Sequence, residues 1–138
     1  MTAAKPELPL YRLYLLRVSY ALLGVLQGLR IWPAILHHSP QWEFWHGVAM
    51  SFFGALTLLA LLGIRYPVRM LPVLLFEVTW KLIWVLAAYL PPYLAHSLDA
   101  DLRDNFASIF LGVVVVPLLL PWGYIWRKYV TEPGDRWR

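Results

Sequence analysis

The sequence predicts an all-α integral membrane protein, a bundle of four transmembrane helices. Of its 138 residues, 60% are hydrophobic and only 14% are charged, whereas a soluble domain carries about 25% charged residues. The apolar residues gather in four stretches, each close to the length of about 20 residues with which a helix crosses a bilayer. Runs such as LTLLALLGI and FLGVVVVPLLL do not alternate between apolar and polar residues, as the strands of a transmembrane barrel would.

The first predicted span covers residues 10–32. Its apolar part is longer than that of a signal peptide, about 7–15 residues, and no small-x-small cleavage site follows it. We therefore expect this span to remain as a membrane anchor. Pro33 is expected to end the helix, because proline lacks the backbone N–H that a continuing helix needs.

The second and third predicted spans cover residues 47–64 and 69–90. Their link is so short that the two helices should form an antiparallel hairpin, and Pro91-Pro92 should end the third. The fourth span covers residues 106–126 and contains Pro117 and Pro121, each of which removes a donor and should bend the helix. Together the spans predict a single four-helix domain over residues 1–138.

Basic residues are distributed unequally between the two ends of this bundle. Four spans place both termini on one side, which holds Lys5, Arg12, Arg65, Arg69, Arg127, Lys128, Arg136 and Arg138. The other side holds Arg30 and Arg103, beside four acidic residues, Glu43, Asp99, Asp101 and Asp104. Because lysine and arginine stay cytoplasmic, both termini are predicted to be cytoplasmic. The bilayer thus accounts for the net charge of +4, and no nucleic-acid partner is expected.

Two ionisable residues, Glu77 and Lys81, interrupt the apolar run LLFEVTWKLIWVLAAYL. They are four residues apart, so they share a helix face and can pair. The first span offers a matching face that contains Arg17, Tyr20 and Gln27. The same face carries two glycines, which permit close approach of another helix.

If the first and third helices are neighbours, Arg17, Glu77 and Lys81 form one group with an excess positive charge. Two interpretations stay open. The ions neutralise one another and fix helix pairing, or the unpaired positive charge binds an anion, a lipid phosphate or a quinone-like carbonyl, since ionisable residues inside a span mark functional sites by default.

All four histidines, His37, His38, His46 and His96, fall on the non-cytoplasmic side of this topology, together with Glu43. Imidazole and carboxylate ligands suit zinc, copper or iron, and Glu43 and His46 lie three residues apart at the start of the second span. No HExxH or comparable spacing is present. A metal site is therefore the minor hypothesis, and histidines at a half-wet interface are the ordinary explanation.

The run GIRYPVRMLPVLLFEVTWKLIW and the later VPLLLPWGYIWRKYVTEPGDRW resemble small bacterial tetraspan membrane proteins, over about the last two-thirds of the chain. In size and span count the chain is also similar to DoxX-like membrane proteins, some of which are linked to quinone-coupled redox metabolism. The first resemblance implies a bacterial inner membrane. Neither resemblance supplies site residues.

For function, the chain has no cysteine and no phosphate loop, nucleophile elbow or dinucleotide fingerprint. The sequence favours a non-enzymatic accessory, scaffold or assembly subunit in a homo-oligomer or beside a larger membrane protein. The alternative is a binder or carrier of a small amphipathic anion, lipid or quinone, centred on Arg17, Glu77 and Lys81. No cofactor is predicted beyond such a bound lipid or quinone. A membrane enzyme with a metal at the outer rim is the third hypothesis.

Overall fold

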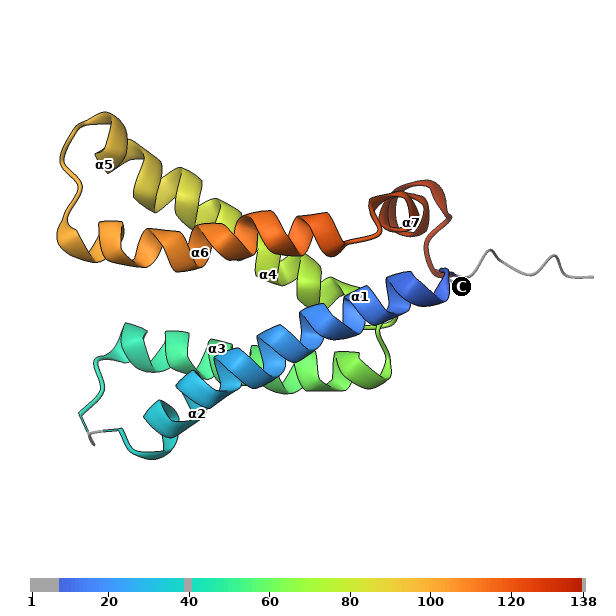
Figure 1. Ribbon diagram of the computed structural model, residues 1–138, viewed down its shortest axis with the longest axis horizontal. Coiled ribbons are helices and arrows are strands. Elements are labelled where there is room, and N and C mark those ends of the chain that lie inside the picture. Colours follow the sequence, from blue (N-terminus) through green and yellow to red (C-terminus); the bar gives the residue numbers. More distant parts are fainter. Residues whose placement is uncertain (1–7, 39–40, 138) are drawn as a thin grey trace, which may run out of the picture.

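The computed structural model describes residues 8–38 and 41–137, and within these ranges every regular element is a helix. Four helical runs are long and apolar enough to cross a membrane (Figure 1): Leu10–Leu36, Phe44–Arg65, Leu71–Leu94 and Ala100–Leu119. The predicted all-α class and the number of candidate spans are therefore confirmed.

Two of the runs change helix type along their length. The first run consists of α1 (Leu10–Ala21), the π-helical segment η1 (Leu22–Leu26) and α2 (Gln27–Leu36). The third consists of α4 (Leu71–Trp84), the π-helical segment η2 (Val85–Tyr89) and α5 (Leu90–Leu94). The second run is α3 (Phe44–Arg65) and the fourth is α6 (Ala100–Leu119), which is followed by α7 (Trp122–Trp126) and the π-helical segment η3 (Arg127–Thr131).

Prolines do not end the first and third helices, so that prediction was wrong. The first run continues beyond Pro33, whose carbonyl accepts the His37 N–H at 3.0 Å. Pro91 and Pro92 lie in the first turn of α5, and the Pro91 carbonyl accepts the Ala95 N–H at 3.0 Å. A proline removes one donor but keeps its own carbonyl in the ladder, and transmembrane helices tolerate this loss.

Acidic side chains set the starts of the second and fourth spans, both of which begin earlier than predicted. The Glu43 carboxylate accepts the N–H groups of Trp45 at 3.0 Å and His46 at 2.8 Å, so α3 begins ahead of residue 47. Asp99 accepts the Leu102 N–H at 2.8 Å, so α6 begins ahead of residue 106. Both carboxylates satisfy donors that the first turn of a helix leaves unpaired.

The fourth span also ends earlier than predicted, at Leu119 rather than near residue 126. Leu120 is extended, with ψ of 138°, and Pro121 precedes α7. Pro117 lies inside α6, as expected, whereas Pro121 lies outside it. The chain turns at this point, so α7 lies across the end of the bundle instead of continuing α6 (Figure 1).

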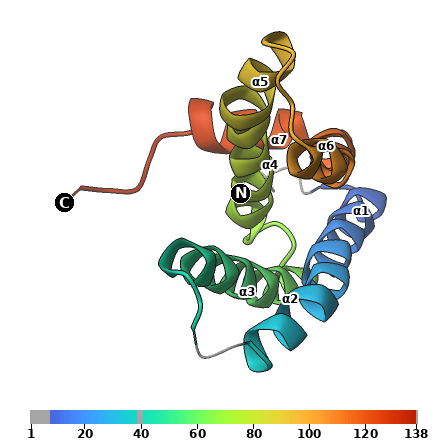
Figure 2. The ribbon, with the colours of Figure 1, turned by 90° about the vertical axis from the view of Figure 1, so that its left-hand side faces the viewer.

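The helices converge at one end of the molecule and spread apart at the other (Figures 1 and 2). The first run packs along α3, and α4 packs against α6 and α3. The buried apolar core is small and includes Leu16, Tyr20, Leu71, Leu74 and Leu120. Many other large apolar side chains are exposed, which suits contact with lipid rather than water.

The converging end carries the segments that the sequence assigned to the basic side. The start of α1, the link over residues 66–70 and the α7–η3 segment all lie there, and the ends of α2 and α5 lie at the opposite end (Figure 1). Lys5 and Arg138, which were also assigned to the basic side, lie outside the described residues.

Candidate functional site

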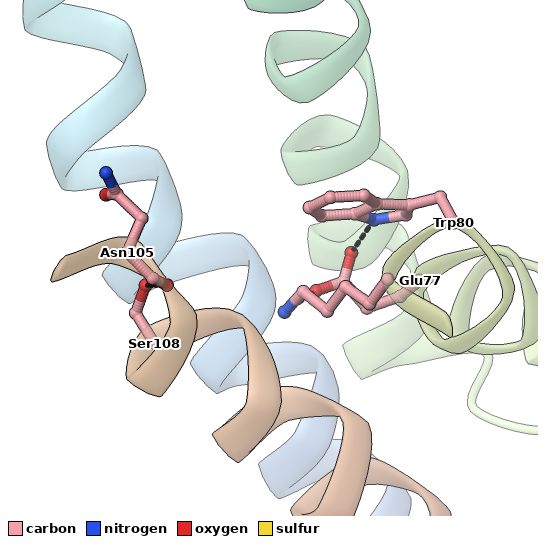
Figure 3. A network of polar contacts seen from close by, with 5 residues as sticks. Glu77, Trp80, Asn105 and Ser108 are labelled. Atoms are coloured by element: carbon pink, nitrogen blue, oxygen red, sulfur yellow. Dashed lines mark hydrogen bonds and ion pairs between the residues drawn. The ribbon is translucent and has the colours of Figure 1, made fainter. Parts of the chain in front are cut away.

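A carboxylate and an ammonium group form an ion pair within the third span. Glu77 of α4 is only 2% exposed, and its Oε1 pairs with Nζ of Lys81, one turn further on. Its Oε2 accepts a hydrogen bond from Trp80 Nε1 at 2.7 Å (Figure 3). Both carboxylate oxygens therefore have partners on their own helix, and the pairing that the four-residue spacing suggested is present.

Arg17 does not join this pair, and the prediction that it would was wrong. Its Nε donates to the Ile64 carbonyl at 3.1 Å, in the last turn of α3. Tyr20, also expected beside the pair, is fully buried and donates its hydroxyl to the Pro67 carbonyl at 2.8 Å. Both side chains therefore hold the end of α3 and the link that follows it. Carbonyls at a helix C-terminus lack intrahelical donors and attract such groups.

The prediction for Arg17 and Tyr20 was wrong because it assigned the first run the wrong partner helix. The glycine face of the first run does pack closely, but against α3: a Cβ on Gly24 would lie 2.9 Å from the Leu61 side chain, and one on Gly28 would lie 3.8 Å from Thr57. The helix α1 packs against α3 and α6. Small residues show that a face admits a close neighbour, but they do not show which helix that neighbour is.

Gly112 of α6 makes room for the ion pair. A Cβ on Gly112 would collide with the Lys81 ammonium and would lie 3.2 Å from both Cδ and Cε of Lys81. The Lys81 side chain therefore lies directly over the α6 backbone. The charged pair on α4 is therefore in contact with α6, but both members of the pair belong to α4.

The pair lines a cavity of about 900 Å³ between the diverging helices. Five charged residues line this space: Arg30, Glu77, Lys81, Asp99 and Asp101. Three of them are acidic and two are basic, so the cavity as a whole has no excess of positive charge. This differs from the cationic group that the sequence suggested, because Arg17 is absent from the lining and Asp99 and Asp101 are present.

The remaining walls of the cavity are mainly apolar. They include leucines of η1, Phe53 of α3, Trp84 of α4 and Ile109 of α6. Gln27 also lines the cavity, so of the residues predicted around the ionic group, Gln27, Glu77 and Lys81 are brought together and Arg17 and Tyr20 are not. An apolar volume of this size with a few polar groups is typical of small-molecule sites, which measure about 300–1,000 Å³.

Two polar residues of α6, Asn105 and Ser108, also line the cavity and were missed by sequence reasoning (Figure 3). Ser108 Oγ donates to the Asn105 carbonyl at 2.9 Å, and Asn105 Nδ2 donates to the Asp101 carbonyl at 2.8 Å. Each side chain thus uses a donor on its own helix and retains an oxygen that can accept a further hydrogen bond. Together with Gly112 they recur at helical spacing on one face, a signal that the sequence does contain.

The outer histidines do not form a metal centre in the part of the chain that the structure describes. Neither His37, His38, Glu43, His46 and His96 nor any other described His, Asp or Glu residues form a group of three or more that could hold a metal ion. The Trp42 ring stacks on His38, with centroids 4.0 Å apart, and meets the His46 ring edge-on at 5.4 Å. The Glu43 carboxylate is used as the cap of α3.

Comparison with known proteins gives no relative: no family model, no curated protein and no solved structure matches this chain. The resemblance to bacterial tetraspan and DoxX-like proteins therefore stays a prediction.

Proposed function

We propose that this chain is a non-enzymatic membrane protein that binds a small amphipathic molecule, a lipid or a quinone, between its diverging helices. The single observation that supports this function most is the position of the Glu77–Lys81 pair, which lines a cavity of about 900 Å³ instead of a dry core. A pair that served only to join two helices would bridge them, whereas this pair is contained within α4.

The chemistry of the lining supports an uncharged or zwitterionic head group over a free anion. The Lys81 ammonium has three N–H donors, of which one is directed at Glu77, so it can donate to a carbonyl or phosphate oxygen. The acidic residues Asp99 and Asp101 at the cavity oppose a ligand with net negative charge. Apolar walls from η1, Phe53 and Ile109 suit a hydrocarbon chain.

Extraction of the purified protein tests this function. Solvent extracts of the parent, Lys81→Met and Ser108→Trp would be compared by mass spectrometry with extracts of bulk membrane. We expect one lipid or quinone class to be enriched in the parent and lost from both variants. Ser108 lies in the cavity wall and not in the core, so its replacement should fill the cavity without unfolding the protein.

Arg103→Met provides the control, because Arg103 is an exposed cation of α6 that does not line the cavity. This variant should keep the enriched class. A parent protein that carries only the bulk membrane lipids, in their bulk proportions, would refute a binding function for the cavity.

A second function, that of an assembly subunit, is favoured by α6. This 20-residue helix contains no buried residue, and Leu118, which does not line the cavity, is 73% exposed. We infer a homo-oligomer or a place beside a larger membrane protein, with α6 in the contact. Cross-linking in native membranes followed by mass measurement tests this, and a clean monomer with no captured partner would contradict it.

For location, we propose the bacterial inner membrane with both termini in the cytoplasm. The support is the unequal distribution of Lys and Arg, eight on one side of the spans against two on the other. The bacterial membrane rests on the tetraspan resemblance alone.

A further inference from the structure

A second cavity, of about 850 Å³, lies at the converging end of the helices, away from the Glu77–Lys81 pair. It is formed by the start of the first run, the link after α3 and the α7–η3 segment. Of the residues that the structure describes, four basic ones line it, Arg17, Arg69, Arg127 and Lys128, together with one carboxylate, Glu132. We propose that this cavity binds a phosphate group, and that its physiological source is the head group of an anionic phospholipid.

The arginines of this cavity have guanidinium donors to spare. Glu132 pairs with Lys128 at 3.2 Å, and no described carboxylate forms an ion pair with Arg17, Arg69 or Arg127. Arg17 uses Nε on the Ile64 carbonyl, which leaves its two terminal nitrogens for another acceptor. Guanidinium groups that line one cavity and that no described carboxylate neutralises are suited to phosphate, because their planar forks match its oxygens.

Tyrosine rings hold these guanidinium groups in place. Arg69 lies over the Tyr66 ring, with its Cζ 5.9 Å from the centroid, and Arg127 lies over the Tyr124 ring at 5.6 Å. Both rings belong to residues that line the cavity. A cation–π contact of this kind restricts the position of a guanidinium and leaves N–H groups available for an anion. Arg69 and Arg127 are thus held near the cavity by rings of its own lining.

The other residues that line the cavity favour a lipid head group over a soluble anion. Leu8, Leu13 and Val68 supply apolar wall beside the cations, and a free phosphate ion would gain nothing from them. Tyr129 also lines the cavity, and its phenol, which is protonated at neutral pH, can donate to a phosphate oxygen. Basic pockets between helices at the cytoplasmic face are the usual place for anionic lipid head groups.

This inference goes beyond the proposed function, because it concerns other residues and stands even if the first cavity is empty. The test uses the full chain in nanodiscs of phosphatidylcholine into which phosphatidylglycerol is titrated, with bound lipids counted by native mass spectrometry. We expect the parent to prefer phosphatidylglycerol. Arg69→Gln with Arg127→Gln should weaken that preference about tenfold or more, since each arginine loses a charge-assisted hydrogen bond.

Arg65→Gln is the matched control. Arg65 also stacks on Tyr66, at 5.4 Å, but does not line the cavity, so its loss should leave the preference unchanged. If the double Gln variant fails to fold, Arg69→Lys with Arg127→Lys replaces it, keeps the charge and removes only the planar fork. This variant should still weaken the preference.

Inorganic phosphate in a parallel titration distinguishes the two sources. Stabilisation of the parent by millimolar phosphate that depends on Arg69 and Arg127, without any lipid preference, would support the phosphate site and assign it to a soluble anion. A parent with no preference for either probe, or a preference that all arginine variants retain, would overturn the proposal.

Discussion

At the residue scale, the Glu77 carboxylate is neutralised within one turn of its own helix. The Lys81 ammonium and the Trp80 indole N–H bind its two oxygens. The polar groups of α4 are therefore paired within the helix and need no partner from another helix. An isolated ionisable residue at the centre of a span costs about 2.5–3.5 kcal/mol on insertion scales. Internal pairing lowers that cost, which explains how an apolar span can carry both charges.

Glu77→Gln should destabilise the protein, because it leaves the Lys81 ammonium largely buried without its anion. Removal of one partner of a buried pair costs about 3–5 kcal/mol, and less where water or snorkelling relieves the charge. The double change Glu77→Gln with Lys81→Met should recover part of the loss. Thermal melts in detergent measure this, with Asp104→Asn, at an exposed acid of α6, as control. Equal melting of Glu77→Gln and the parent would show that the pair contributes nothing to stability.

Gly63→Ala should also destabilise the protein, through steric overlap. A Cβ at Gly63 would collide with the buried Tyr20 ring, whereas a Cβ at Gly123 would meet nothing within 4 Å. Overpacking of this kind costs about 1–3 kcal/mol. In thermal melts, Gly63→Ala should melt below the parent. Gly123→Ala, the control, should match or exceed the parent because alanine favours a helix. Two equal melting temperatures would mean that Tyr20 can move aside.

Stability should depend on pH through Glu43. Hydrogen bonds from the N–H groups of Trp45 and then His46 lower the pKa of its carboxyl. A group whose pKa is lowered on folding contributes stability above its unfolded pKa, about 4.3, and loses it as the pH falls through the folded pKa. The parent should therefore melt above Glu43→Gln at pH 7, and the difference should shrink at pH 3. A difference that is the same at both pH values would show that the charge of the cap is irrelevant.

At the element scale, the existence of the helices could be predicted from the sequence and their ends could not. A long apolar run fixes where a span must lie, whereas its end depends on local partners such as the Glu43 and Asp99 caps. Whether a proline ends a helix also depends on the residues around it. Each helix continues past Pro33 or Pro91 because a later N–H group bonds to the proline carbonyl. The proline residue alone does not predict whether that bond forms.

The site was predictable only where its contacts are local. The Glu77–Lys81 pair follows from spacing along one helix. The placement of Arg17 depended on which helix α1 contacts, and the cavity depends on how far the helices diverge. Both are properties of several elements together, so no pattern within one stretch of sequence contains them.

The hydrogen bonds of Arg17 and Tyr20 should stabilise the conformation of the α3–α4 link. Their side chains donate to the carbonyls of Ile64 and Pro67, and each bond contributes about 0.5–1.5 kcal/mol. Arg17→Gln and Tyr20→Phe should each speed hydrogen exchange in residues 66–70, as measured by mass spectrometry of peptides. Exchange within α6 should stay unchanged and serves as the internal control. Uniformly faster exchange would instead indicate global destabilisation.

At the scale of the whole molecule, orientation in the membrane decides which leaflet the phosphate cavity would face. Reporter fusions at Arg138 and within residues 99–104 test it. A fusion at Arg138 should be active only with a cytoplasmic reporter, and one within residues 99–104 only with a periplasmic reporter, because Lys and Arg gather on the side of the termini. The opposite result at both positions would invert the topology and move the phosphate cavity to the outer leaflet.

The π-helical segments η1 and η2 interrupt the first and third runs between the packed core and the spreading end of the molecule. Each π segment is an α-helix with one inserted residue, and return to α geometry would rotate everything beyond it by about 100° and shift it by about 1.5 Å. η1 separates the buried Tyr20 from Gln27 and Arg30 at the cavity, and η2 follows Trp84. The helix type in these segments therefore sets which way the outer halves of the two runs face. Deletion of Val25 would remove the inserted residue, so the first run would become a continuous α-helix while Gln27 and Arg30 keep their orientation at the cavity.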